Sequence, residues 1–223
     1  MVRTIMTFAA LLVLAAGNAQ AESGLPFQDF SLGPHYQTIK SDFAGASSAG
    51  TMYGLDVAIN GSYADTLLNG QNNRLRFGDY LGVHATLSGA NYKSSGNRYF
   101  AGLGYALGAQ AGLAVSDYAD IGARYYVDFR DNKFGSLNNS QSLRLNTAQL
   151  MVRLAKIYIA AGAGNGKKAQ GDETFRSSTF HVRYLFADGG YAGVMMDSLK
   201  IKYELTGRND TITNIVVQFG IAH

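Results

Sequence analysis

Side-chain character alternates at every second residue over most of this chain, most regularly between Tyr99 and Arg130. Within that stretch, the odd positions from Ala119 to Phe129 are all apolar, whereas Asp120, Arg124 and Asp128 stand at even positions. A period of two places successive side chains on opposite faces of an extended strand. The chain is therefore expected to form a β-sheet with one apolar face and one face of glycine and charge.

The same alternation recurs in further segments, which are separated by polar or glycine-containing connections. An antiparallel barrel with both chain ends on one side requires an even number of strands. Eight such segments follow from Arg74 onward. The regular alternation at 52–60 indicates a further strand, and because nine strands are not allowed, the weaker segment before it must also belong to the wall. The pattern therefore favours ten strands. In the eight-strand alternative, residues 22–73 would form an N-terminal extension or plug. The predicted strands lie at about 32–40, 52–60, 74–88, 99–116, 119–130, 142–154, 157–164, 179–186, 198–205 and 214–221.

The predicted connections alternate between long and short. The long ones are 89–97, 131–141 and 165–174, and the short ones are 116–118, 155–156 and 188–190. Outer-membrane barrels show this asymmetry, with short periplasmic turns and longer outer loops. The sequence therefore predicts an all-β fold, a transmembrane antiparallel up-and-down β-barrel of eight or ten strands, with ten preferred. The barrel would occupy residues 51–223, after an N-terminal segment, 22–50, that holds a possible first strand and a loop.

The predicted strand 142–154 changes phase in its middle. Leu143 and Leu145 share one face, whereas Ala148 and Leu150 share the other. One inserted residue near Asn146 would produce this change, so the pattern predicts a β-bulge at Asn146–Thr147.

The first 21 residues have the three parts of a secretory signal peptide. Arg3 precedes an apolar core from about Met6 to Ala16, and Ala19-Gln20-Ala21 forms a cleavage site. No later apolar run approaches the ~20 residues that a transmembrane helix needs. We therefore expect export from a bacterial cytoplasm. The chain has no cysteine for disulfides, and its net charge of +3 without a basic run argues against a nucleic-acid partner.

The signal peptide, the hairpin LGYALGAQAGLAVSDYADIGARYYVDF and the final strand IVVQFGIAH together resemble a known group. They are similar to the small outer-membrane β-barrels of Gram-negative bacteria, the OmpA-like transmembrane and opacity-type porin group. The resemblance covers roughly residues 50–223. It implies residence in the outer membrane, contact with its lipid bilayer and lipopolysaccharide, and recognition of the last strand by the barrel assembly machinery. The chain departs from that pattern in ending on His223 instead of an aromatic residue, and in lacking tryptophan.

Charged residues on the predicted inner face must pair, because the interior of a barrel of this size is narrow and buried single charges are costly. A salt-bridged core that fills the lumen is one interpretation, and a small selective pore is the other. The inner-face glycines between Phe100 and Ser116 favour some open volume. The lumen-facing candidates are Asp56, Arg76, His84, Asp120, Arg124, Asp128, His181, Arg183, Lys200, Lys202 and Glu204, the last three lying opposite an outward face that carries Leu199 and Ile201.

No residue pattern predicts catalysis, a cofactor or a metal site. His84 and His181 both have inward parity, away from a bilayer substrate, and no His, Asp or Glu cluster has metal-ligand spacing. We therefore expect no enzyme activity, and a structural or surface-interaction role through the outer loops. The alternatives are a narrow channel for small solutes and a soluble lipocalin-like barrel with the apolar face inside. A lipid A-modifying enzyme has the least support.

Overall fold

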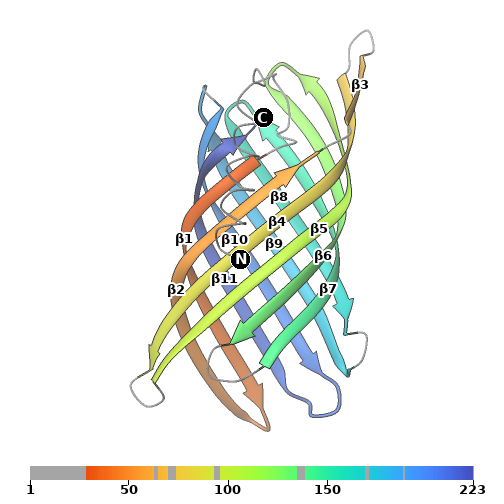
Figure 1. Cartoon of the computed structure of the whole chain (residues 1–223). Helices are drawn as coiled ribbons and strands as arrows, with labels where there is room; N and C mark the ends of the chain where they lie inside the picture. Colours follow the sequence, from red (N-terminus) through yellow and green to blue (C-terminus); the bar gives the residue numbers. More distant parts are fainter. Residues whose placement is uncertain are drawn as a thin grey trace.

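The chain forms a tall, tilted barrel of antiparallel strands in a computed structural model (Figure 1). The structure describes residues 29–62, 65–69, 74–92, 96–134, 139–168, 171–187 and 189–222; the predicted signal peptide lies outside them. The strands are β1 Asp29–Phe43, β2 Ala46–Gly61, β3 Asp65–Asn69, β4 Arg74–Tyr92, β5 Gly96–Ser116, β6 Ala119–Phe134, β7 Asn139–Leu154, β8 Ile157–Lys167, β9 Glu173–Leu185, β10 Gly190–Tyr203 and β11 Asn209–Ala222.

The barrel closes because β1 pairs with both β2 and β11. Every other wall strand pairs with its neighbours in sequence, and β2 pairs with β4 over Tyr53–Gly61. The five-residue β3 pairs with the start of β4, beyond the point where β2 ends. Ten strands thus form the wall, which confirms the predicted ten-stranded antiparallel up-and-down barrel and rules out the eight-strand alternative.

The barrel has two different ends. At the end drawn at the top of Figure 1, which we call the terminal rim, β1 begins at Asp29 beside Ala222 at the end of β11. At the opposite end, the hairpin rim, β1 turns into β2 through Ala44 and Gly45, which both have positive φ, as a two-residue hairpin turn requires. No helix among the described residues is long and apolar enough to cross a membrane.

The predicted long loops are mostly strand, so that part of the prediction was wrong. β4 and β5 remain paired to Tyr92 and Gly96, and β6 and β7 to Phe134 and Asn139. Asparagine and serine in these stretches suggested loops, but an antiparallel ladder continues through polar residues when the partner strand is present. The hairpins therefore extend as paired backbone toward the hairpin rim.

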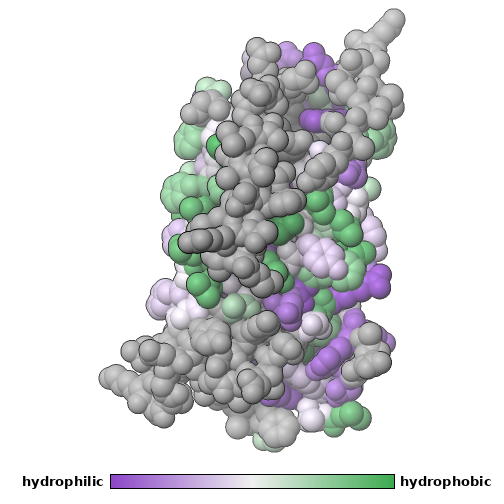
Figure 2. Space-filling view, in the orientation of Figure 1, coloured by the Kyte–Doolittle hydropathy of each residue, from purple (hydrophilic) through white to green (hydrophobic). Residues whose placement is uncertain are grey.

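Apolar side chains face outward around the wall. Leu150 on β7 is 69% exposed, and its neighbours Gln149 and Met151 are buried inside. Figure 2 shows apolar side chains on the visible wall, between hydrophilic ones nearer the two ends. The lipocalin-like alternative required the opposite orientation and is therefore excluded. Similar exposed residues include Leu55, Val83, Leu87, Leu107, Ile121, Tyr125, Phe180, Val194, Met196, Val217 and Phe219.

The predicted β-bulge at Asn146–Thr147 is absent. β6 and β7 pair without interruption from Ala119–Leu154 to Phe134–Asn139. Leu143 and Leu145 therefore point into the lumen, where both are buried, and the later leucines of the strand point outward. The phase change marks a change in environment near the hairpin rim, where the inside of the wall becomes apolar.

The same change in environment explains why the predicted orientation of β10 was wrong. Leu199 and Ile201 were predicted to face outward, but they lie in the lumen and are almost fully buried. Together with Ile212 and Phe175 from β11 and β9, they pack in one cluster that also contains Leu143 and Leu145. We call these six residues the apolar cap. The cap occupies the lumen toward the hairpin rim.

Candidate functional site

The lumen holds the densest arrangement of buried polar side chains in the described structure. Near the terminal rim, Arg183 of β9 pairs with Asp29 of β1, with Nη1 3.0 Å from Oδ2. Asn60 donates a hydrogen bond to the other carboxylate oxygen at 2.8 Å, and the Tyr80 hydroxyl donates to Asn60 at 2.7 Å. This chain of contacts connects strands that are not neighbours in the sheet.

Arg124 stands at the centre of the same half of the lumen. Its Nε and Nη2 donate to the Gln110 side-chain carbonyl at 3.1 and 2.9 Å. Its guanidinium lies 4.1 Å from the Tyr80 ring centroid, and Arg183 lies similarly 4.5 Å from the Tyr191 ring. Aromatic faces attract cations most where water is excluded. These rings therefore help to stabilise two buried guanidinium groups.

Arg130 bridges two carboxylates across the lumen toward the hairpin rim. Its Nε lies 2.6 Å from Asp128 on the same strand, and its Nη1 lies 2.9 Å from Asp197 on β10. Three strands separate β6 from β10 in the sheet. Both carboxylates are buried, so their charges depend on this guanidinium for compensation.

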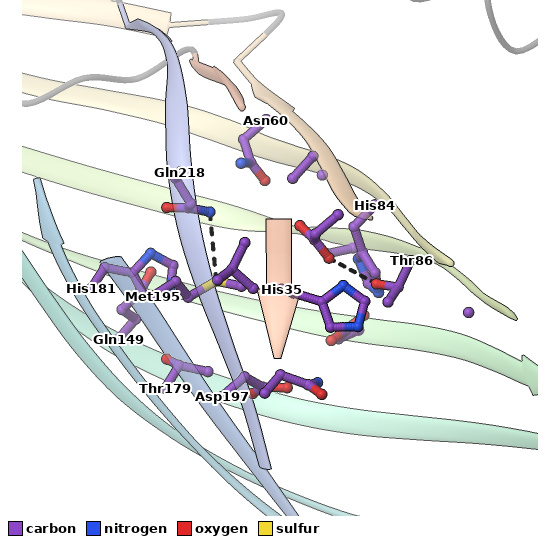
Figure 3. A pocket seen from close by; sticks show the side chains of 18 of the residues that line it. His35, Asn60, His84, Thr86, Gln149, Thr179, His181, Met195, Asp197 and Gln218 are labelled. Carbon is purple, nitrogen blue, oxygen red and sulfur yellow. Dashed lines mark hydrogen bonds between the residues drawn. The ribbon is translucent and has the colours of Figure 1, made fainter. Parts of the chain in front are cut away.

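A cavity of about 140 Å³ lies between these networks (Figure 3). His35, His84 and His181 line it from three strands, and Figure 3 shows them converging on the space with Asp197 and Gln218. Several buried polar atoms of its lining form no hydrogen bond with the described residues. They are His35 Nδ1, Gln37 Nε2, Asp128 Oδ1, Thr179 Oγ1, Arg183 Nε, Asp197 Oδ1, Asn214 Oδ1 and Gln218 Oε1. Such atoms make the cavity suitable for water or another small polar guest.

The inner-face glycines make room for neighbouring side chains. A Cβ on Gly104 would clash with the imidazole of His84, and one on Gly108 would clash with the backbone of Tyr125 and Tyr126 on β6. Two of the glycines predicted to leave open volume are therefore already in close contact, one with a side chain and one with the neighbouring strand.

The acidic and histidine side chains of the lumen do not form a metal site. Among the described residues, no group of three or more His, Cys, Asp or Glu side chains could hold a metal ion. Thr86 donates to Asp56 at 2.7 Å, and His35 Nε2 lies 2.8 Å from the Ser88 hydroxyl. These contacts hold the side chains in place.

The predicted site residues divide into two groups. The structure brings Asp56, His84, Asp120, Arg124, Asp128, His181 and Arg183 into the lumen, and Arg76 lies on the inner face opposite Gly112. Asp120 pairs with Arg153 at the terminal rim. The prediction was wrong for Lys200 and Lys202, which are exposed on the outer wall, and for Glu204, which lies in the turn after β10.

Sequence reasoning missed the partners that complete the networks. Asp29 lies in the segment with the weakest alternation, which offered no signal. Asp197 faces inward in β10, on the same face as Leu199 and Ile201. Because those two residues are apolar, the sequence suggested that this face points outward. The alternation places Arg130 on the same face as Asp128, but Arg130 was not included among the lumen-facing candidates.

Comparison with known proteins finds distant structural similarity alone. No family model and no curated protein matches the chain. The translocator domain of the autotransporter NalP from Neisseria meningitidis is 11% identical over 98% of this chain and 95% of that one, with a TM-score of 0.40. The transport unit of the autotransporter AIDA-I from Escherichia coli is 10% identical over 97% of both chains, with a TM-score of 0.47.

The attachment invasion locus protein Ail of Yersinia pestis is also similar. It is 7% identical over 87% of this chain and 99% of that one, with a TM-score of 0.32. With such identities and TM-scores below 0.5, these similarities assign neither a family nor a function to the chain.

Proposed function

We propose that the chain is an outer-membrane β-barrel with a closed lumen, which serves as a structural or surface-interaction element. The observation that carries the proposal is the apolar outer face of a closed barrel. Large apolar patches are rare on soluble monomers. In hydrocarbon, by contrast, a closed barrel satisfies its whole backbone and needs such a face. Its partners would be the lipid bilayer with its lipopolysaccharide and, during insertion, the barrel assembly machinery.

The filled lumen favours a scaffold over an open pore. The Arg130 bridge crosses it toward the hairpin rim, where the apolar cap also occupies it. The paired backbone of the β4–β5 hairpin continues beyond the exposed Leu87 to Tyr92 and Gly96, and that of the β6–β7 hairpin continues to Phe134 and Asn139. Rigid hairpins present a defined surface, so contact with other molecules at this end is the role that the geometry favours.

Catalysis remains the least supported role. His84 and His181 line the cavity inside the wall, whereas a bilayer substrate would lie outside it. A narrow channel is the second candidate, favoured by the charged cavity of about 140 Å³. For that role, the Arg130 bridge and the apolar cap would have to leave a path for solutes. Membership of the OmpA-like and opacity-type group stays a prediction.

Electrical recording separates the scaffold from the channel. We expect the purified protein, refolded into planar bilayers, to give no discrete conductance steps, because the polar networks and the apolar cap cross the lumen. A general porin added to the same bilayers provides the positive control. Reproducible steps from the wild-type protein would instead support the narrow channel.

A further inference from the structure

The outer face of the wall changes from apolar to basic near the hairpin rim. On β9, outward Phe180 is followed toward this rim by Ser178 and then Arg176. On β10, outward Met196 is followed by Ser198 and then Lys200. Met196 and Lys200 are four residues apart, roughly 13 Å along a strand. The basic residues thus stand just beyond the apolar surface, at the depth where a membrane's head groups would begin.

Five exposed basic residues gather in this zone on four successive strands. Lys200 of β10 stands directly opposite Arg176 of β9. Thr174 of β9 stands opposite both Lys167 of β8 and Lys202 of β10. We call the set the outer basic cluster, which consists of Arg144, Lys167, Arg176, Lys200 and Lys202.

Little negative charge in the described structure compensates the cluster. Glu204 lies 2.7 Å from Lys202. This hydrogen bond and the nearby charges of Lys202 and Lys167 lower the pKa of Glu204, which keeps the carboxylate ionised beside these two lysines. Arg144 instead lies 5.6 Å from the Phe129 ring centroid. Among the described residues, Lys167, Arg176 and Lys200 make no ion pair.

The pair Arg176–Lys200 is unfavourable in the protein alone. Directly opposed side chains on antiparallel strands lie about 5 Å apart at Cβ, where like charges destabilise a sheet. A multivalent anion between the strands would remove that repulsion. The neighbouring outer surface is apolar. An anion attached to acyl chains can therefore contact the basic residues with its charge and the apolar surface with its chains.

We infer that the outer basic cluster binds the phosphate groups of a lipid head group in the leaflet at the hairpin rim. In an outer membrane with periplasmic termini, that lipid is lipopolysaccharide. The inference rests on the proposed membrane function and deepens it, because it names the lipid and the residues that bind it. In this orientation, the hairpin rim faces the cell exterior.

The test compares binding of diphosphorylated lipid A and its phosphate-free counterpart to the full-length mature protein in detergent. Arg176→Gln/Lys200→Gln removes the opposed pair, and Arg74→Gln/Lys156→Gln removes two exposed charges near the other rim as a matched control. With about 1 kcal/mol for each basic residue near a charged membrane surface, the first variant should bind diphosphorylated lipid A about 10- to 30-fold more weakly. The control should bind like the wild type.

Three outcomes would overturn the inference: equal weakening in both variants, equal wild-type binding of the two lipids, or full displacement by inorganic phosphate, which would indicate a free-anion site. Each variant must first show that its unboiled and boiled forms migrate differently on a gel, as a folded barrel does. If the wild-type protein lacks this behaviour and needs no detergent for solubility, the proposed membrane function itself fails. A folded membrane barrel without phosphate preference contradicts the lipid site alone.

Discussion

Replacing Arg130 by methionine is expected to lower the free energy of unfolding by about 3–5 kcal/mol, because removing one partner leaves buried charge uncompensated. Here one substitution leaves two carboxylates, Asp128 and Asp197, without their shared partner. Urea titration of the barrel refolded in lipid vesicles, followed by the gel mobility of folded and unfolded forms, measures the change.

Lys40→Met is the matched control. Lys40 pairs with Asp42 near the hairpin rim, with Nζ 3.5 Å from Oδ2, and the two side chains are 60% and 47% exposed. Exposed pairs contribute less than about 1 kcal/mol, so this variant should unfold almost like the wild type. Adding Asp128→Asn and Asp197→Asn to Arg130→Met should restore much of the stability. If the triple variant is no more stable than the single one, compensation of charge is not what Arg130 provides.

Truncating the apolar cap is expected to have the second large effect. Leu145→Ala should cost about 2–5 kcal/mol, as other buried leucine truncations do. Leu145 is 0% exposed and packs in the lumen with Phe175, Leu199 and Ile201. The same urea titration measures the loss.

Leu205→Ala makes the identical chemical change at a residue that is 87% exposed, in the turn after β10. This variant should change stability by less than about 0.5 kcal/mol. Equal effects at the two positions would mean that Leu145 does not lie in a packed lumen. The original prediction of a bulge before Ala148, with leucines on the lipid side, would then regain support.

The alternation of side chains predicted the ten wall strands and, over the middle of the barrel, which face lies outside. It did not predict which way β7 and β10 face near the hairpin rim. A period of two shows which residues share a face, but the assumption that apolar residues face outward holds only over the middle of the barrel. Beyond it, Leu145 and Ile201 pack inside the lumen, and the outer face carries lysine and arginine.

The pairing inside the lumen was beyond sequence reasoning for a different reason. Arg183 meets Asp29, and Arg130 meets Asp197, across a barrel in which these strands are not neighbours. Such contacts depend on the strand tilt and on the register of the whole sheet. The spacing of residues within one strand could indicate that these charged side chains face the same interior, but it could not indicate which of them pair.

The central claim is that the apolar face of this barrel contacts lipid and the polar face encloses the lumen. Because the chain contains no cysteine, Thr179→Cys and Phe180→Cys provide unique labelling sites on adjacent residues of β9. Thr179 lines the cavity, whereas Phe180 is exposed on the outer wall. With an environment-sensitive fluorophore at each position, brominated lipids should quench the label at 180 strongly and the label at 179 weakly. Stronger quenching at 179, or no quenching at either position, would contradict the claim.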